Sequence, residues 1–522
     1  MVSRLPPEIL QEIFKYNLCT KSPIFENLKK SCLLVNRYWC YNAVSLIWEE
    51  PLNVCSTSES RKDSKDDIME IYITNLPQES KSLLRKSGID SQEISRHSRT
   101  TINYASFLQK IELQDLYDIV TRWVIRSKYY SLKLYEETKP KRLLLYRELC
   151  KFFISQNPKL KFSIRLDSIK WNEYIHFQQL SGIIPVNSCL EKLICYTLVK
   201  DEIYESISKI FTEIKDLEIM CNEEKDNIDN IGLASLIDKM RENTAWSLTI
   251  NRIYRPIPNI IKSLEKKVHL LTSLNIYGDG PYPSKVFSKC KLLKKLIIEV
   301  DEFEDDKLVL TPFIRHSFKQ LMEFDYYSGS TVNVLLIAMI IMNTRKTLKY
   351  LRISWYKEIQ VIDPKNHTLL ISTIITHCPN LTELVISLNQ LTINQIPDVM
   401  RKCNKLRRIF LNWCEEEEPI EIKNWVWNLG ETIPSLLQLL YFDNNNMGLN
   451  IDSLELFLNR CQKKSIKYLE LKIDDWLSAE DLEVNSRRVL NLIELYESNG
   501  ILHPNTKSNW ALNRKRNGFH AM

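Results

Sequence analysis

Apolar residues recur in one arrangement along most of the chain: an apolar residue, two variable residues, an apolar residue, one variable residue and a third apolar residue. The clearest copies are Leu293-x-x-Leu296-x-Ile298, Leu348-x-x-Leu351-x-Ile353, Leu381-x-x-Leu384-x-Ile386 and Leu406-x-x-Ile409-x-Leu411. Further copies begin at Leu190, Ile214, Leu271, Leu321 and Ile466, weaker copies at Ala245 and Leu436, and a weak copy with Phe162 and Ile164 precedes them. Successive copies are about 28 residues apart. Side chains of a strand alternate between its faces, so each copy predicts a strand with its apolar set facing the core.

The intervals between copies are long enough for helices, for example at 332–343, 366–377 and 451–461. The sequence therefore predicts an α/β solenoid with a curved parallel sheet inside and helices outside. Residues between and just after the apolar positions are then expected on the concave face: Tyr196, Tyr277, Glu323, Asp325, Tyr327, Tyr350, Arg352, Glu383, Arg408, Phe410, Tyr468 and Lys472. Tyrosine and arginine are favoured in binding hot spots, so the aromatic and arginine members of this set are the candidate partner-binding residues. The copy at 436–442 is ambiguous, because Leu437, Leu440 and Phe442 fit the inward set as well.

The first 50 residues predict three short helices. Leu5-Pro6 opens the first helix, because proline is tolerated in a first turn, and Glu8 is favourable near the positive end of the helix dipole. The apolar stripe of this helix is Ile9, Leu10, Ile13 and Phe14, the second helix carries Leu33, Leu34 and Val35, and the third carries Ala43, Leu46 and Ile47. So small a unit buries little surface by itself, which favours docking on a partner.

Residues 51–155 are expected to be a polar linker followed by a helical connecting region. The segment 55–67 is polar and charged, and helical patterns follow over 78–87, 104–125 and 142–154, with Gly88 as a C-cap. After the repeats, Ser478 to Asp481 resembles a capping box that opens a helix to about Ser498. The expected domains are 1–50, 51–155, a repeat array of about 11–12 copies over 156–475, and a capping helix with a frayed tail over 476–522.

Two further patterns accompany the repeats. Eight positions after the first apolar residue, the copies carry Asn222, Asn389, Cys414 and Asn444, or Asp279, Asp301 and Asp474. Cysteines stand at or just before the strands: Cys189, Cys290, Cys378, Cys403 and Cys461. These residues resemble the cysteine-containing leucine-rich repeats of F-box proteins.

The N-terminal segment resembles the F-box itself. The matching residues are Leu5-Pro6-x-Glu8-Ile9-Leu10-x-x-Ile13-Phe14, a centre of Leu34-Val35-Asn36-Arg37-x-Trp39, and a closing Leu46-x-Trp48. The stretch from Thr20 to Lys30 is longer and more polar than in compact F-boxes. The chain thus resembles F-box leucine-rich-repeat proteins.

The resemblance implies a non-catalytic substrate receptor of an SCF-type ubiquitin ligase. The F-box would dock on a Skp-family adaptor, and through it on cullin and RING subunits, while the repeats hold a protein substrate. By family position, Leu5, Pro6, Ile9 and Leu10 would meet the adaptor, and Ile13, Phe14, Val35, Trp39 and Leu46 would form the F-box core. The substrate would bind at the concave residues Tyr196, Tyr277, Tyr327, Tyr350, Arg352, Arg408, Phe410 and Tyr468.

Composition excludes several other classes. The net charge is +6, from 71 Lys and Arg against 65 Asp and Glu, and the two signs are mixed along the chain, so no nucleic-acid partner is expected. The longest apolar run, 334–342, is too short for a membrane span, and a buried helix is expected there. The 13 cysteines lack Cys-x-x-Cys spacing and no signal peptide is recognisable, which predicts reduced thiols in cytoplasm or nucleus.

No catalytic or metal-binding motif is present. The eight histidines show no metal-site spacing, only 10 glycines are available for phosphate loops, and no cofactor or metal is expected. The acidic runs 301–306 and 415–418 fit solvated loops. Two alternatives remain: a leucine-rich-repeat scaffold whose N-terminal helices are only a cap, and an α/β domain with evenly spaced buried strands.

Overall fold

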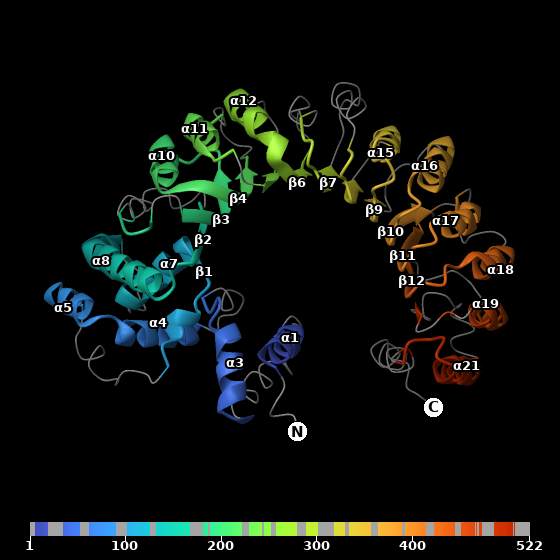
Figure 1. The fold of residues 1–522 in the computed structure, drawn as a ribbon, viewed down its shortest axis with the longest axis horizontal. Coiled ribbons are helices and arrows are strands. Elements are labelled where there is room, and N and C mark those ends of the chain that lie inside the picture. Colours follow the sequence, from blue (N-terminus) through green and yellow to red (C-terminus); the bar gives the residue numbers. More distant parts are fainter. Residues whose placement is uncertain are drawn as a thin grey trace. The chain divides into compact units, whose positions relative to one another are not determined.

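The structure is a computed structural model. It describes residues 6–18, 35–52, 62–89, 102–125, 132–166, 180, 182–185, 188–221, 229–242, 245–251, 257–278, 289–300, 318–328, 334–355, 364–388, 392–413, 422–443, 450–464, 466, 469–471, 485–504 and 506. The chain divides into two compact units, Met1–Thr244 and Ala245–Met522. Both are α/β, and the described residues form thirteen parallel strands, which confirms the predicted fold class at this level (Figure 1).

The first unit begins with helices and continues as alternating strands and helices. Its elements are α1 (Pro7–Leu18), α3 (Arg37–Ile47), α4 (Lys62–Asn75), α5 (Gln78–Lys86), η3 (Tyr104–Phe107), β1 (Lys110–Glu112), α7 (Leu113–Ile125), α8 (Leu132–Gln156), β2 (Lys161–Arg165), β3 (Ser188–Tyr196), α10 (Asp201–Ile210), β4 (Phe211–Met220) and α11 (Ile231–Lys239). Strand β2 pairs in parallel with β1 and with β3, and β3 pairs with β4.

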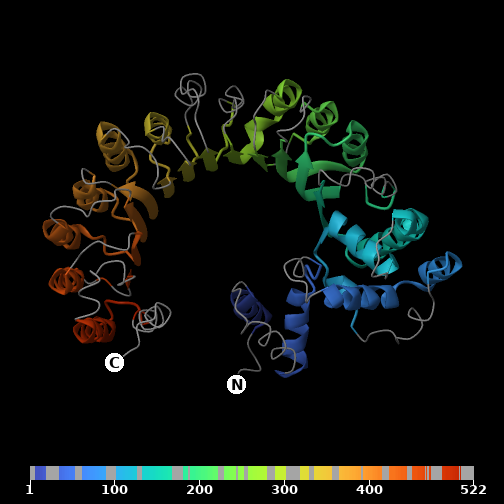
Figure 2. The same cartoon turned by 180° about the vertical axis from the view of Figure 1, so that it is seen from behind.

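The described residues of the second unit contain nine strands, most of them alternating with helices. Its strands are β5 (Trp246–Asn251), β6 (Leu271–Tyr277), β7 (Lys295–Val300), β8 (Glu323–Ser328), β9 (Tyr350–Trp355), β10 (Glu383–Leu388), β11 (Arg408–Trp413), β12 (Leu439–Asp443) and β13 (Glu470–Leu471). The helices are α12 (Pro258–Lys267), η5 (Val268–Leu270), α15 (Val334–Met342), α16 (Pro364–His377), η6 (Ile393–Gln395), α17 (Ile396–Lys402), α18 (Ile422–Thr432), α19 (Ile451–Lys463) and α21 (Ser486–Ser498). Within this unit the strands line the inner side of a curve and the helices lie outside it (Figures 1 and 2).

Within the second unit, consecutive strands pair in chain order, and the apolar triplets keep the register. Leu384 lies between Leu351 and Ile409, and Ile386 lies between Ile353 and Leu411. These side chains are at most 1 % exposed. Burial of one such side chain contributes about 1.5–3 kcal/mol, so a one-residue slip that turned a triplet outward would cost several times this amount.

The same register defines three rows of side chains on the inner face of the sheet, which is the face opposite the helices. In the first row, Lys295, Glu323, Tyr350, Glu383, Arg408 and Leu439 are neighbours in strand order. In the second row, the neighbours are Ile297, Asp325, Arg352, Val385, Phe410 and Tyr441. Tyr277, Glu299 and Tyr327 belong to the third row.

The structure settles the register of the ambiguous copy. Leu437 and Leu440 are at most 1 % exposed, whereas Leu436 is 48 % exposed. Strand β12 pairs Leu440 with Ile409 and Phe442 with Leu411, so the register of this copy is the one that begins at Leu437. Tyr441 therefore belongs to the inner face.

Two expectations for the connecting region are wrong. The continuous helix expected over 104–125 is a 3-10 turn (η3), the short strand β1 and helix α7. Strand β1 pairs with β2, so the sheet begins inside the range expected to be only helical. A three-residue strand with one apolar residue between two charged ones is too short to show a strand period.

The ends of several elements agree with the sequence. Helix α5 ends at Lys86 and Gly88 has a φ of 70°, and Gly500, also at 70°, follows α21. After α21 the chain returns to the sheet, where the Ile501 carbonyl accepts a hydrogen bond from the Leu469 amide. The predicted capping box at 478–481 and the turn residues Asn222, Asn389, Cys414, Asn444, Asp279, Asp301 and Asp474 lie outside the described residues.

Four of the five cysteines expected before the strands pack in the core, whereas Cys189 is half-buried and lies inside β3. Cys290, Cys378, Cys403 and Cys461 are at most 1 % exposed, and all nine described cysteines are free thiols. The Cys403 thiol donates to the Cys378 carbonyl at 3.2 Å. Burial raises the pKa of Cys290 and of Cys403 to about 12, which keeps both thiols protonated and poorly nucleophilic.

In the part of the chain that the structure describes, no helix has the length and apolar character needed to cross a bilayer. The apolar run at 334–342 forms helix α15, and six of its nine side chains are buried, as expected.

Burial of His367 in α16 makes the second unit sensitive to acid. The side chain is 3 % exposed, and burial lowers the pKa of His367 to about 4. His367 of the unfolded chain binds a proton below about pH 6.5, whereas His367 of the folded chain binds one only below about pH 4. The free energy of unfolding therefore decreases as the pH falls from about 6.5 to about 4. At pH 5 the loss relative to pH 7 is about 2 kcal/mol.

We predict that His367→Asn removes this part of the pH dependence. Urea unfolding at pH 7 and pH 5 should show a larger loss for wild type than for the variant, with His377→Asn on the same helix as the control. Equal losses in wild type and His367→Asn would contradict the prediction.

Candidate functional site

The N-terminal helices α1 and α3 pack face to face in the first unit. Their shared core consists of Leu10, Phe14 and Ala43, each at most 5 % exposed, with Trp39 and Leu46 packed against it. The rings of Phe14 and Trp39 pack edge to face, with their centroids 5.4 Å apart. The two helices therefore share a small hydrophobic core.

Local sequence explains where these helices begin. Pro7 is the first residue of α1, and the Pro6 carbonyl accepts the Leu10 amide at 3.0 Å. Asn36 caps α3, since its side-chain oxygen accepts the Trp39 amide at 2.9 Å. A proline at the first helical position and an asparagine N-cap are both favoured at these places.

Two residues lie differently from their expected roles. Leu10, expected to meet a partner, is fully buried in the core, while Val35, expected in the core, is 54 % exposed. Leu10 lies one turn from Phe14 and so faces α3, whereas Val35 precedes the N-cap Asn36 and is outside the helix. Pro6 and Ile9 are exposed, Ile9 by 50 %, as a docking role requires.

Other predicted residues of this segment are not described. Leu5 lies outside the described residues, and so does the side chain of Ile13. Among the described residues of this segment, the exposed large apolar side chains are Ile9, Val35, Tyr38 and Tyr41; Tyr41 contacts Phe107, and we call the other three residues the helix-pair face.

Aromatic contacts join the helix pair to the elements that follow it. Trp48 stacks at a tilt on Tyr104 with centroids 4.3 Å apart, and meets Tyr72 of α4 edge to face at 5.5 Å. Tyr41 contacts Phe107 at 5.6 Å. Such contacts add about 0.5–1.5 kcal/mol each beyond area burial, so the pair is fixed to its neighbours in the first unit.

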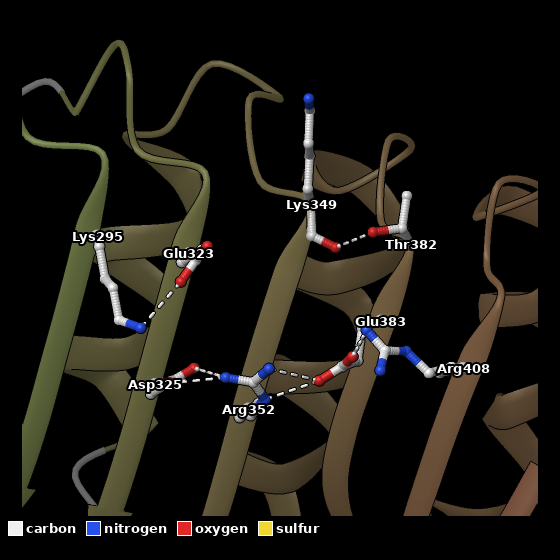
Figure 3. A network of polar contacts seen from close by, with 8 residues as sticks. All are labelled: Lys295, Glu323, Asp325, Lys349, Arg352, Thr382, Glu383 and Arg408. Carbon is white, nitrogen blue, oxygen red and sulfur yellow. Dashed lines mark hydrogen bonds and ion pairs between the residues drawn. The ribbon is translucent and has the colours of Figure 1, made fainter. Parts of the chain in front are cut away.

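In the second unit, a charged network crosses four strands of the inner face (Figure 3). Arg352 of β9 lies between two carboxylates: its Nη1 is 3.1 Å from Asp325 of β8, and its Nε donates to Glu383 of β10 at 2.7 Å. Arg408 of β11 reaches the other oxygen of Glu383 at 2.6 Å. On the first row, Lys295 and Glu323 form a separate pair at 3.1 Å.

The carboxylate and guanidinium side chains of this network differ in their exposure to solvent. The side chains of Asp325 and Glu383 are 4 % exposed, whereas those of Arg352 and Arg408 are 30 % and 51 % exposed. The carboxylates therefore lie beneath the guanidinium groups, and the surface offered to a partner is cationic. Asp325 and Glu383 lie on the inner face as expected, but they are buried there, because arginine side chains from the neighbouring strands cover them.

The electrostatics follow from this burial. Burial raises the pKa of Asp325 above its usual range, although the Arg352 guanidinium opposes the shift. Burial by itself would lower the pKa of Arg352, but its hydrogen bonds to Glu383 and Asp325 raise it overall. Arg352 thus remains charged, and the ion pairs of Arg352 and Arg408 with Glu383 hold both side chains in place, which reduces the entropy lost when a partner binds.

Apolar side chains adjoin the exposed guanidinium of Arg408. Phe410 and Tyr441 are neighbours in the second row, with ring centroids 5.7 Å apart, and Val385 and Leu439 are half-buried beside them. Arginine, phenylalanine and tyrosine side by side form the composition of a protein-binding hot spot. We call Arg352, Arg408, Phe410 and Tyr441 the inner-face patch.

The remaining predicted residues are spread over the sheet. Tyr277, Tyr327 and Tyr350 lie half-buried on the inner face of the second unit, outside the inner-face patch, and Tyr196 is half-buried in β3 of the first unit. Tyr468 lies outside the described residues. Sequence reasoning missed Tyr441, because the register at 436–442 was open; the burial of Leu440 was the missing information.

Among the described residues, no group of three or more His, Cys, Asp or Glu side chains is placed to hold a metal ion. The inner-face patch offers guanidinium groups and aromatic rings, which suits binding of a partner surface.

Comparison with known proteins gave no match, either to a family model or to a curated protein.

We predict that the buried carboxylate at Glu383 stabilises the second unit. Glu383→Gln keeps the shape but leaves Arg352 and Arg408 without their shared anion, which should cost about 2–3 kcal/mol of unfolding free energy. Glu323→Gln, on the same row and half-exposed, should cost less than about 1 kcal/mol. Urea unfolding of the three proteins measures both values, and equal costs would contradict the layered network.

Proposed function

We propose that the chain is the substrate-receptor subunit of an SCF-type ubiquitin ligase. In this proposal the helix pair α1 and α3 is an F-box that docks on a Skp-family adaptor, which links it to cullin and RING subunits. The strand–helix repeats are leucine-rich repeats whose inner face holds a protein substrate. The chain itself is a non-catalytic component.

The helix-pair face is the observation that carries the proposal. Ile9 of α1, Tyr38 of α3 and Val35 just before α3 are 50 %, 38 % and 54 % exposed, and the two helices have only a small core of their own. Exposed large apolar side chains on so small a unit favour a protein-binding role. The ordered match of this segment to the F-box pattern supports the adaptor as its partner.

The repeat part supports the second half of the proposal. Its strands are parallel and in strict chain order, and strands such as β6, β9, β10 and β11 carry a fully buried apolar triplet, with helices on the outer side. This agrees with leucine-rich repeats, which use an extended inner surface for binding. The inner-face patch is the proposed centre of substrate contact.

The proposed mechanism is tethering. A receptor that holds a substrate on the same assembly as a ubiquitin-charged conjugating enzyme raises the effective concentration of the substrate lysines. The groups that must act in this chain are then those that bind and orient, and the fixed guanidinium groups of Arg352 and Arg408 suit that role.

One observation favours a second candidate, a leucine-rich-repeat scaffold with no part in ubiquitin transfer. The aromatic contacts of Trp48 and Tyr41 attach the helix pair to η3 and α4, as a terminal cap of the array would be attached. A cap needs no partner, so capture of the adaptor distinguishes the two candidates.

We predict that Ile9→Asp weakens adaptor capture by at least about a hundredfold, because a carboxylate would be buried without a partner in the interface. Co-purification of the full chain with a purified Skp-family adaptor measures this. The matched control is Ile231→Asp, also at an exposed isoleucine, at the first position of α11, which should leave capture unchanged. Failure of the wild-type chain to bind the adaptor would exclude the F-box proposal.

A further inference from the structure

One edge of the second unit collects positive charge. Parallel strands all start at the same edge of a sheet, so the segments that lead from a helix into the next strand lie there together. Apart from Lys289 and Arg401, which pair with Glu265 and Asp398, these segments and the ends of α17 and α19 carry eleven exposed lysines and arginines: Lys291, Lys294, Lys319, Arg345, Lys346, Lys349, Lys402, Lys405, Arg407, Lys463 and Lys464. We call this set the basic rim.

Backbone hydrogen bonds connect the rim from one repeat to the next. The amides of Met322, Lys349, Thr382 and Arg407 donate to the carbonyls of Lys294, Met322, Lys349 and Thr382, at 2.8–2.9 Å. Lys294, Lys349 and Arg407 therefore lie at the starts of every second strand, about 10 Å apart. Figure 3 shows the Lys349 side chain extending away from the charged network, beyond the start of its strand.

The described segments that carry most of the rim contain no acidic side chain, and Glu265 and Asp398 of the adjoining helices pair with Lys289 and Arg401. The segments 289–294, 318–322, 343–349, 377–382, 402–407 and 433–438 contain no Asp or Glu. The Lys405 ammonium donates to the Asn380 side-chain oxygen at 2.7 Å, which is a neutral partner. The nearest carboxylate groups of the sheet, Glu323 and Glu383, are already paired with Lys295, Arg352 and Arg408.

The turn into β9 holds two rim residues in a backbone conformation that does not suit them. Arg345 and Lys346 have φ values of 51° and 66°, in the left-handed region. The Thr347 hydroxyl fixes this turn by donating to the Leu321 carbonyl at 2.6 Å. Side chains other than glycine and asparagine cost about 1–2 kcal/mol in that region, so the fold alone gives no reason for two adjacent cations here.

We propose that the basic rim binds an acidic segment of a partner protein. From β7 to β11 the rim extends over four strand spacings, about 19 Å, which about six residues of an extended chain can follow. Within the rim, lysines outnumber arginines nine to two, and lysine acts as a point charge without fixed bidentate geometry. A run of aspartate and glutamate side chains supplies the matching negative charge.

Two features favour a polypeptide over a nucleic acid. Single-stranded nucleic acids bind through aromatic stacking, and the one aromatic side chain in these described segments, Phe318, is 2 % exposed. Base reading in duplexes uses bidentate side chains, most often arginine, and this rim has few. The proposal does not depend on the adaptor, because the rim lies in the second unit and α1 and α3 lie in the first.

The test uses the full chain and a fluorescent peptide of about ten glutamates, with anisotropy measured at low and at physiological salt. The key variant is Arg345→Asn with Lys346→Asn, because asparagine tolerates the left-handed backbone and carries no charge. We expect peptide binding to weaken about fivefold while thermal stability stays equal to or above that of wild type. A second variant, Lys349→Glu with Arg407→Glu, should abolish binding.

The matched control removes the same number of exposed cations elsewhere in the unit, at Lys262→Gln and Arg487→Gln, and should bind as wild type does. Two results would overturn the proposal. One is peptide binding that is absent in wild type or equal in wild type and both rim variants. The other is tighter binding to a mixed-sequence DNA duplex of about ten base pairs, lost in the rim variants, which would assign the rim to nucleic acid.

Discussion

Every functional feature of the second unit depends on strands that pair in chain order through a fixed register. Leu384 and Ile386 of β10, with their equivalents on the neighbouring strands, are buried at the same two levels of the sheet. Because side chains alternate, burial of these residues forces the residues between them onto the inner face. The core thus determines which side chains become neighbours across strands that are about 28 residues apart in sequence.

This constraint explains both candidate surfaces of the unit. Asp325 and Arg352 meet because neighbouring strands place them side by side, Glu383 reaches Arg352 diagonally from the first row, and Phe410 lies beside Tyr441. At the strand starts, the ladder of backbone hydrogen bonds brings cations from several repeats to one edge. Charges of both signs are mixed along the sequence and sum to only +6, yet the fold gathers lysines and arginines at one edge of the sheet. The expectation that no nucleic acid binds was based only on how positive and negative residues are distributed along the sequence.

The sequence predicted what depends on local periodicity. The strands, the parallel α/β architecture and the inner-face positions of Arg352, Tyr350 and Phe410 follow from the apolar triplet. It did not predict features decided by a neighbour. Asp325 and Glu383 are covered by arginines of adjacent strands, and Leu10 and Val35 exchange their expected exposures because a helix turn and an N-cap decide them. Strand β1 was missed because it is recognisable only through its pairing with β2.

The central claim is that separate surfaces serve separate partners, the helix-pair face for the adaptor and the inner face for a substrate. Hydrogen–deuterium exchange of the full chain, with and without a purified Skp-family adaptor, tests it most directly. The account predicts new protection in α1 and α3, with the amides of β8 to β11 unchanged. Absence of protection in α1 and α3, or protection on the sheet instead, would contradict it.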